Sequence, residues 1–155
     1  MNKKSISANR RGFTLIELLV VVAIIGLLST LAVVALGSAR EKARDSKRLS
    51  DVKQVQTALE LYYTDNNLYP APASAITLGS TNYACLNSGS GFTTAGCSDA
   101  YMGQVPADPL SAQSYTYTSA DGSTYEITLT LEGAMGGFGG GAATATPSGI
   151  TGQAL

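Results

Sequence analysis

Hydrophobic and polar residues are distributed unevenly along this 155-residue chain. Residues 1–12 are polar and basic, whereas residues 18–36 form an apolar run of mostly Leu, Val, Ile and Ala without a charged side chain. That length is about what an α-helix needs to cross a bilayer. The run is longer than the apolar part of an ordinary secretory signal, and charge-rich helical sequence follows it. It is therefore predicted to be retained as a membrane anchor.

Residues 38–66 have the pattern of an amphipathic helix. Apolar residues recur there at offsets of three and four, which predicts one buried stripe: Leu49, Val52, Val55, Leu59 and Tyr62 or Tyr63. Opposite charges at the same offsets predict an exposed, solvated face: Glu41 with Arg44, Asp45 with Arg48, and Lys47 with Asp51. Contact with lipid headgroups or a neighbouring subunit is the alternative for that face. Turn-forming residues predict the end of the helix near residues 65–67.

One continuous helix over residues 13–66 would be roughly 80 Å long. A head of about 100 residues cannot cover a helix of that length. Its first half therefore needs lipid or sister helices around it, which gives a physical basis for polymerisation.

Two alternating segments further along the chain predict a β-hairpin. They are residues 115–118 and 125–131, rich in aromatic and β-branched side chains, with the turn pair Asp121-Gly122 between them. One alternate set is expected to face the helix: Tyr125, Ile127, Leu129 and Leu131. Because two strands alone are marginally stable, a third is expected from the loop or the tail.

These patterns predict an α+β fold, in which a long N-terminal helix packs against a small antiparallel sheet. The chain divides into a leader at 1–12, a hydrophobic helix at 13–37 and an amphipathic helix of the head at 38–66. A loop with a Cys pair and the β-hairpin follow at 67–132, and a Gly/Ala/Thr-rich tail at 133–155. The low complexity of the tail suggests that it is flexible or attached at an edge.

The charges are segregated, although the net charge is only −1. Every Lys and Arg lies at or before Lys53, and only acids follow: Glu60, Asp65, Asp99, Asp108, Asp121, Glu126 and Glu132. Such a head would repel a polyanion, so direct nucleic-acid binding by the head is not expected. The chain has no His, which removes the Ser-His and Cys-His pairs of nucleophilic catalysis. A non-enzymatic protein is predicted, with a tethered hydrolase as the disfavoured alternative.

The sequence contains one cysteine pair, Cys85 and Cys97, within a stretch rich in Ser, Gly and Thr. This setting favours a disulfide in an oxidising compartment, and two free thiols in a reducing cytosol are the alternative. The charge rule for membrane orientation is undecided, because six basic residues follow the apolar run and four precede it. The cysteine pair and the composition of the head favour an external head.

Glu17 is an acid set just inside the apolar region. A carboxylate carried into the bilayer is unfavourable by about 2.5–3.5 kcal/mol, so it needs a cation or a functional reason. No side chain from Gly12 through Gly37 supplies a cation, but a cut between Gly12 and Phe13 would create an α-amino group four residues away, on this chain or a neighbour. The alternative is that Glu17 reaches out to the membrane interface.

The surrounding residues, Arg11-Gly12-Phe13-Thr14-Leu15-Ile16-Glu17-Leu18-Leu19, resemble the processing motif of type IV prepilins and type II secretion pseudopilins. The resemblance implies that a prepilin peptidase cuts after Gly12 and N-methylates Phe13, and that Glu17 acts in filament assembly. One position departs from the family pattern, because Val34 stands where many members have Pro.

Tyr69-Pro70 and the stretch Val105-Pro106-Ala107-Asp108-Pro109 also resemble major pseudopilins. Some of those proteins bind calcium in loops near the sheet, and three acids here have suitable oxygen ligands: Asp99, Asp108 and Asp121. Their spacing does not support a metal site. Turn and cap roles are predicted for them instead, and no cofactor is expected.

The resemblance leads us to expect a structural subunit of a type IV pilus-like filament. Copies would polymerise through the N-terminal helix with the help of an inner-membrane assembly platform, after residence in membrane lipid as a single-pass protein. The mature location would be a cell-surface or periplasmic filament. A major pseudopilin of a type II secretion system is the alternative within the family, and a monomeric membrane-anchored extracytoplasmic binding module is the alternative from another class.

Overall fold

The computed structural model describes residues 12–154, so the expected leader lies outside the described residues except for Gly12. The first element is helix α1, Leu15–Asn66. The chain divides after Ala39 into two compact units, an N-terminal helix unit and the head, which begins at Arg40. The fold is α+β, as predicted, with one long helix and antiparallel sheets.

The N-terminal helix unit presents its apolar side chains outward. Large apolar residues from Leu15 to Leu36 are 46–80% exposed. By length and composition, α1 contains one segment able to cross a membrane. Because exposed apolar surface is unfavourable in water, this unit requires lipid or another protein around it.

In the head, α1 buries the predicted stripe. Val52, Val55 and Leu59 are at most 1% exposed. Tyr62 is buried whereas Tyr63 is 39% exposed, which settles the choice between the two tyrosines. The helix ends at Asn66, and Asn67 adopts a positive φ of 57° while its N–H donates to the Tyr63 carbonyl at 2.8 Å. This is the left-handed helix end that Asn tolerates.

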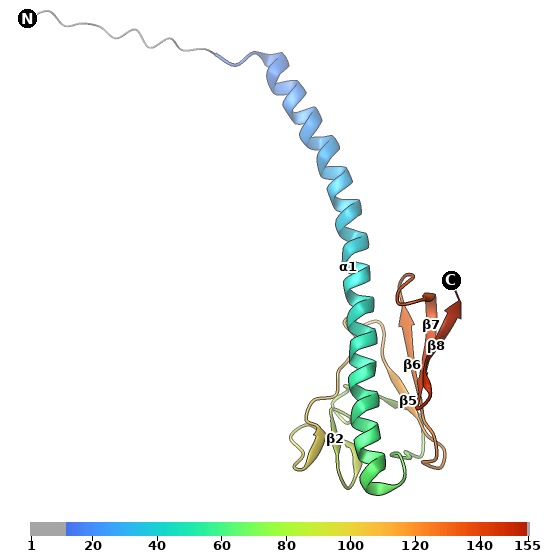
Figure 1. The fold of residues 1–155 in the computed structure, drawn as a ribbon. Helices are drawn as coiled ribbons and strands as arrows, with labels where there is room; N and C mark the ends of the chain where they lie inside the picture. Colours follow the sequence, from blue (N-terminus) through green and yellow to red (C-terminus); the bar gives the residue numbers. More distant parts are fainter. Residues whose placement is uncertain (1–11, 155) are drawn as a thin grey trace, which may run out of the picture. The chain divides into compact units, whose positions relative to one another are not determined.

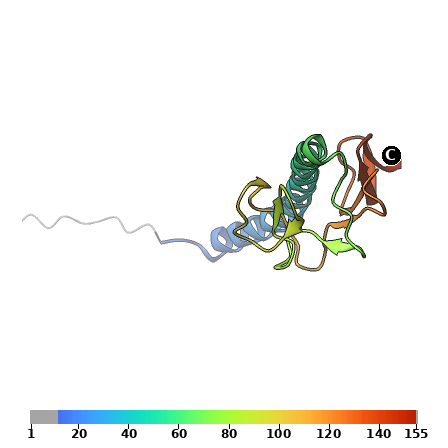
Figure 2. The same ribbon diagram turned by 90° about the horizontal axis from the view of Figure 1, so that it is seen from below.

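A five-stranded antiparallel sheet packs against this half of α1, in the order β1-β5-β6-β7-β8 (Figures 1 and 2). Its strands are β1 (Ile76–Thr77), β5 (Thr116–Thr118), β6 (Glu126–Leu131), β7 (Phe138–Thr146) and β8 (Gly149–Ala154). The β5–β6 hairpin is the predicted one, paired with Tyr117 opposite Ile127. The inward set is confirmed, because Tyr125, Ile127, Leu129 and Leu131 are all buried.

The Gly-rich tail supplies two strands of the hairpin's sheet, β7 and β8. β7 pairs with β6 over five residues, and β8 forms the edge next to β7. The tail therefore follows the edge-attached alternative rather than the flexible one. Its small residues serve the packing, because Ala143 and Ala145 alternate inward and are at most 2% exposed.

The loop predicted ahead of the hairpin, within residues 67–132, contains β1 and a second sheet, β3-β2-β4. These strands are β2 (Cys85–Asn87), β3 (Gly91–Thr93) and β4 (Ala100–Met102). Strands of three residues are too short to show a period in the sequence. Figures 1 and 2 show this sheet and the five-stranded sheet on different sides of the head half of α1.

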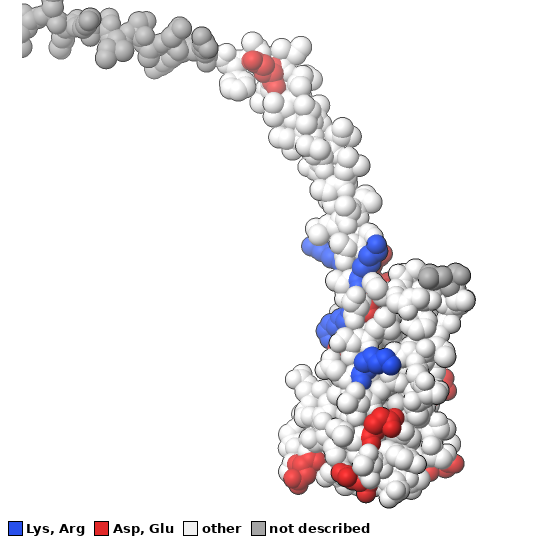
Figure 3. Space-filling model, in the orientation of Figure 1, with Lys and Arg blue, Asp and Glu red and all other residues white. Residues whose placement is uncertain are grey.

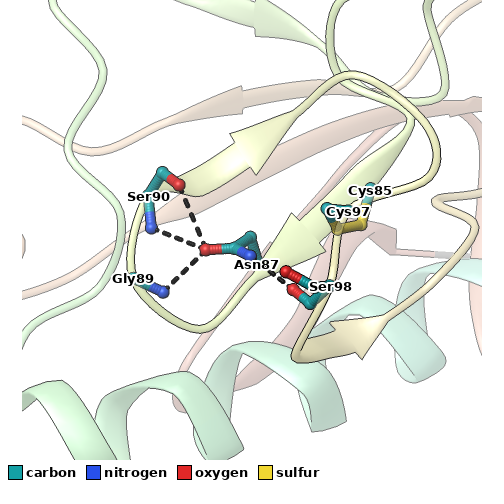
Figure 4. Close-up of a disulfide and its surroundings, with 6 residues drawn as sticks. All are labelled: Cys85, Asn87, Gly89, Ser90, Cys97 and Ser98. Atoms are coloured by element: carbon teal, nitrogen blue, oxygen red, sulfur yellow. Dashed lines mark hydrogen bonds between the residues drawn. A yellow bond between two sulfur atoms is a disulfide. The ribbon is translucent and has the colours of Figure 1, made fainter.

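A disulfide joins Cys85 of β2 to Cys97, with their Cα atoms 6.4 Å apart. Next to it, the Asn87 side-chain oxygen accepts bonds from the Gly89 and Ser90 N–H groups at 2.8 and 3.0 Å (Figure 4). The Asn87 amide donates to the Ser98 carbonyl at 2.6 Å. The disulfide and this amide therefore both attach the segment just before β4 to β2.

Candidate functional site: the N-terminal assembly segment

Gly12 and Phe13 lie just before α1 and are open to solvent. Phe13 is 85% exposed, and no atom approaches the Cβ position of Gly12 within 4 Å. Nothing among residues 12–39 therefore shields the predicted cleavage bond from a protease. The cleavage itself stays a prediction.

Thr14 and Glu17 form a capping box at the start of α1. The Glu17 carboxylate oxygen Oε2 accepts bonds from the Thr14 N–H at 2.8 Å and from the Thr14 hydroxyl at 2.6 Å. The Glu17 N–H in turn donates to Thr14 Oγ1 at 3.3 Å. This reciprocal arrangement satisfies backbone donors that a helix N-terminus otherwise leaves unpaired.

The capping role of Thr14 was not predicted, although its signal is present in the sequence. Thr14-x-x-Glu17 ahead of an apolar run is the spacing of a capping box. In the single chain, the Glu17 carboxylate therefore has hydrogen-bond donors without a cation beside it. A role for its charge in assembly requires a test that separates charge from capping.

Glu17 also borders an exposed apolar surface. An open hollow of about 380 Å³ is lined by Phe13, Ile16, Glu17, Val20 and Val21. Four of these five residues are apolar, so the hollow suits an apolar side chain or lipid tail, with one acid at its edge.

In the head, a buried ionic cluster attaches α1 to two loops of the sheet region. We call it the Arg48 cluster, and its members are Arg44, Asp45, Arg48, Asp108 and Glu132. The Arg48 side chain is fully buried and donates two hydrogen bonds to Asp108, of 2.8 and 2.9 Å. It also donates to Asp45 at 2.7 Å and to Glu132 at 2.5 Å.

The other charged groups of the Arg48 cluster also have hydrogen-bond partners. Asp45 accepts from the N–H groups of Glu132 and Gly133 at 2.9–3.1 Å, and Arg44 forms a two-bond pair with Glu132. The Arg44 guanidinium, with help from Arg48, lowers the pKa of Glu132 from 4.5 to about 2. Buried charges of this kind require such complete pairing.

The predicted solvated face is therefore wrong for three residues, because Asp45, Arg48 and Asp51 are buried. Two of the predicted helix pairs form, Asp45 with Arg48 and Lys47 with Asp51, but Arg44 bonds to Glu132. Long-range partners override the local pairing, since a periodic charge pattern carries no information about the sheet that faces it.

The three acids considered for calcium lie in separate environments. Both carboxylate oxygens of Asp108 are engaged by Arg48. Asp121 accepts from the Ser123 N–H at 2.9 Å and from its hydroxyl at 2.6 Å, as in a turn. Asp99 has a positive φ of 51°. Among residues 12–154, no group of three or more acidic or Cys side chains could hold a metal ion, so these residues do not fit a shared calcium site.

Two protein-family models match the chain, one over the N-terminal helix unit and one over most of the head. The prokaryotic N-terminal methylation motif matches residues 7–37, and the family described as "Type II secretion system (T2SS), protein G" matches residues 35–146. The second match covers most of the head. No solved structure matches at a significant level.

Individual relatives carry the same description. Type II secretion system core protein G of Vibrio cholerae is 35% identical over 136 residues, which cover 84% of this chain and 87% of that protein. The protein of that name from Pectobacterium carotovorum is 34% identical over 100 residues, which cover 64% of this chain and 62% of the relative. The one from Escherichia coli K12 is 46% identical over 61 residues, 39% of this chain and 42% of the relative.

The first of these alignments and the head-wide family match lead to one conclusion. The chain belongs to the type II secretion system protein G family.

Proposed function

We propose that the chain is the major pseudopilin of a type II secretion system, a structural subunit without catalytic activity. The observation that carries the proposal is the family match over residues 35–146. The N-terminal motif is shared by pilins and pseudopilins, so it does not separate them. A match that extends through the head favours the secretion system over the pilus-like filament first expected.

In this proposal, the helix unit passes from lipid to a bundle of sister helices. Large apolar side chains from Leu15 to Leu36 are exposed in the single chain and need cover in both states. Lipid tails are as apolar as these side chains, so the exchange gains little hydrophobic energy. Specificity must then come from shape and from polar pairs, and Glu17 is the acid available for one.

The polar pair would form between Glu17 and an α-amino group released by prepilin peptidase. Cleavage after Gly12 creates that amine on Phe13, which the peptidase then N-methylates. Oε2 of Glu17 already accepts the two bonds from Thr14, so assembly would add a charged partner to a carboxylate held in place by its cap.

The head would remain on the outer side of the inner membrane, as part of a periplasmic filament. The Cys85–Cys97 disulfide suits that oxidising compartment. The Arg48 cluster fixes α1 to the β6 end and to the Asp108 loop, so that the head moves as one body with its part of the helix.

Three variants separate the charge of Glu17 from its capping role. Glu17→Gln keeps a side chain able to cap but loses the charge, Thr14→Ala weakens the cap but keeps the charge, and Glu17→Leu loses both. We expect Thr14→Ala to assemble and the two Glu17 variants to fail, as judged by electron microscopy of sheared filaments and by secretion of exoproteins. Normal filaments from Glu17→Gln would overturn the charge pairing.

Mass spectrometry of the mature N-terminus tests processing independently. The expected terminus is N-methylated Phe13. An intact leader would support the monomeric anchored module instead. Deletion of the gene decides between filament types, because loss of surface pili with normal protein secretion would favour the pilus subunit.

A further inference from the structure

The six basic residues of the head look equivalent in the sequence, but in the structure some are paired with acids and others are not. Three of them are paired with acids of the head: Arg44 with Glu132, Lys47 with Asp51, and Arg48 with three carboxylates. The other three, Arg40, Lys42 and Lys53, are exposed and form no ion pair within residues 12–154. The free positive charge of the head therefore lies mainly at its first residues.

Arg40 and Lys42 follow the apolar segment closely. In the sequence they come four and six residues after Leu36, and both belong to α1. Two residues apart, they point about 200° away from each other around the helix. Figure 3 shows Lys and Arg atoms on two sides of α1 at this end of the head.

We propose that Arg40 and Lys42 form a basic collar that binds the phosphates of anionic lipid headgroups where the apolar segment leaves the bilayer. The proposal rests on the membrane anchoring contained in the proposed function. Long basic side chains at such a position keep their stems on apolar surface and extend their charge to the headgroups.

The arrangement around the helix favours lipid over a second protein chain. Before assembly no bundle of sister helices surrounds the chain, and headgroups contact a membrane helix on every side, whereas a single bound protein contacts one face. Two cations at nearly one height on opposite sides therefore fit a lipid surface. Glu41 lies between them in the sequence, about 100° from each, and its exposed carboxylate weakens the collar.

The collar gains importance when the leader is removed. The leader carries Lys3, Lys4, Arg10 and Arg11, all lost by cleavage after Gly12. The mature chain then has basic side chains on only one side of its apolar segment, the side predicted to be external. Contact with anionic lipid compensates for positive charge on the translocated side, which membrane insertion otherwise disfavours.

The test uses the full mature chain in nanodiscs. Because the sequence contains no Trp, Leu36→Trp, one turn before Arg40, adds a single fluorophore next to the collar. Quenching is compared between brominated phosphatidylglycerol and brominated phosphatidylcholine at equal mole fraction. We expect a preference for phosphatidylglycerol on the order of fivefold, because Arg40, Glu41 and Lys42 together carry one net positive charge next to the anionic surface.

Matched variants in the Leu36→Trp background decide the assignment. Arg40→Gln with Lys42→Gln should reduce the preference to onefold or less, because Glu41 remains, and Glu41→Gln should increase it. Lys53→Gln, roughly 17 Å further along the helix from Lys42, should leave it unchanged. Arg40→Lys with Lys42→Arg should keep it, because the charge is conserved.

Two results would overturn the collar while leaving the pseudopilin assignment intact. One is equal quenching by the two lipids in the parent. The other is an unchanged lipid preference in Arg40→Gln/Lys42→Gln combined with altered self-association in phosphatidylcholine, which would assign the residues to contact with a second copy. Absence of quenching by both lipids would instead refute membrane insertion, and with it the collar.

Discussion

Arg48 and Lys47 are neighbours on one helix, and each has an acid three or four residues away. The structure nevertheless gives their pairs different surroundings. The side chains of Arg48 and Asp45 are 0% and 1% exposed, whereas that of Lys47 is 52% exposed. Arg48→Ala and Lys47→Ala therefore compare a fully buried cation with one that is half-exposed, each paired with a buried acid.

The expected cost of Arg48→Ala follows from what the change leaves behind. Four hydrogen bonds are lost, and Asp108 keeps only the bond from the Leu110 N–H at 2.8 Å. A buried carboxylate that loses its cation destabilises the fold by about 3–5 kcal/mol. Lys47→Ala removes a cation that is 52% exposed, and Asp51 keeps the bond from the Tyr115 hydroxyl at 3.1 Å, so the change should cost about 1 kcal/mol. Domains of this kind have about 5–15 kcal/mol of stability in total.

The assay is urea unfolding of the full chain in detergent, followed by near-ultraviolet circular dichroism of tyrosine. All eight Tyr lie at or beyond Tyr62 and the chain has no Trp, so the signal reports on the head. Arg48→Lys provides an intermediate case, because it keeps the charge but cannot form the same forked bonds. If Arg48→Ala and Lys47→Ala differ by less than about 1 kcal/mol in unfolding free energy, the cluster does not stabilise the head as argued.

Three further predictions concern the head. Arg44 lowers the folded-state pKa of Glu132 from 4.5 to about 2. The contribution of the Glu132 carboxylate to stability should therefore be complete above pH 4.5 and decline as the pH falls towards 2. Glu132→Gln should flatten that part of a plot of the unfolding midpoint against pH. Reduction of the Cys85–Cys97 disulfide should lower the unfolding free energy by about 3 kcal/mol in the chain-entropy estimate, with a Cys85→Ser/Cys97→Ser variant insensitive to reductant as the control. Gly122→Ala should cost more than Gly96→Ala in the same denaturation assay, since both glycines have φ of 79° but only a Cβ at Gly122 would clash, 2.8 Å from the Tyr69 carbonyl oxygen.

The helix and the hairpin were predictable because their residues have strong local patterns. The apolar residues from Leu49 to Tyr62 repeat at helical spacing. Residues 125–131 alternate between apolar and polar side chains, just after the turn signal at Gly122. Both elements are long enough for the pattern to be read. The N-terminal motif was recognisable for a similar reason, since all its residues lie within one short stretch.

The short strands and the Gly-rich strands were not predictable in this way. β2, β3 and β4 have three residues each, and β7 begins with Phe138 followed by three glycines. Glycine has little intrinsic preference for a strand. These segments are ordered by pairing with β6 or with one another, which depends on residues distant in the sequence.

The candidate site shows the same division. The roles of Gly12, Phe13 and Glu17 could be predicted from the sequence, because the motif that contains them has a fixed register. The Arg48 cluster was missed as a buried feature, because Asp108 and Glu132 are 60 and 84 residues from Arg48. The proposed basic collar was not predictable from the sequence, because only the structure shows which of the six cations are paired with acids.

The sequence by itself determined the apolar segment, the amphipathic helix, the hairpin and the processing motif, because each depends on neighbours within a few turns or strands. Only the tertiary structure decided which charges are buried, which remain free, and that the Gly-rich tail completes the sheet. The physical reason is that burial and ion pairing depend on what faces a side chain across the core, and that partner is chosen by the fold of the whole head.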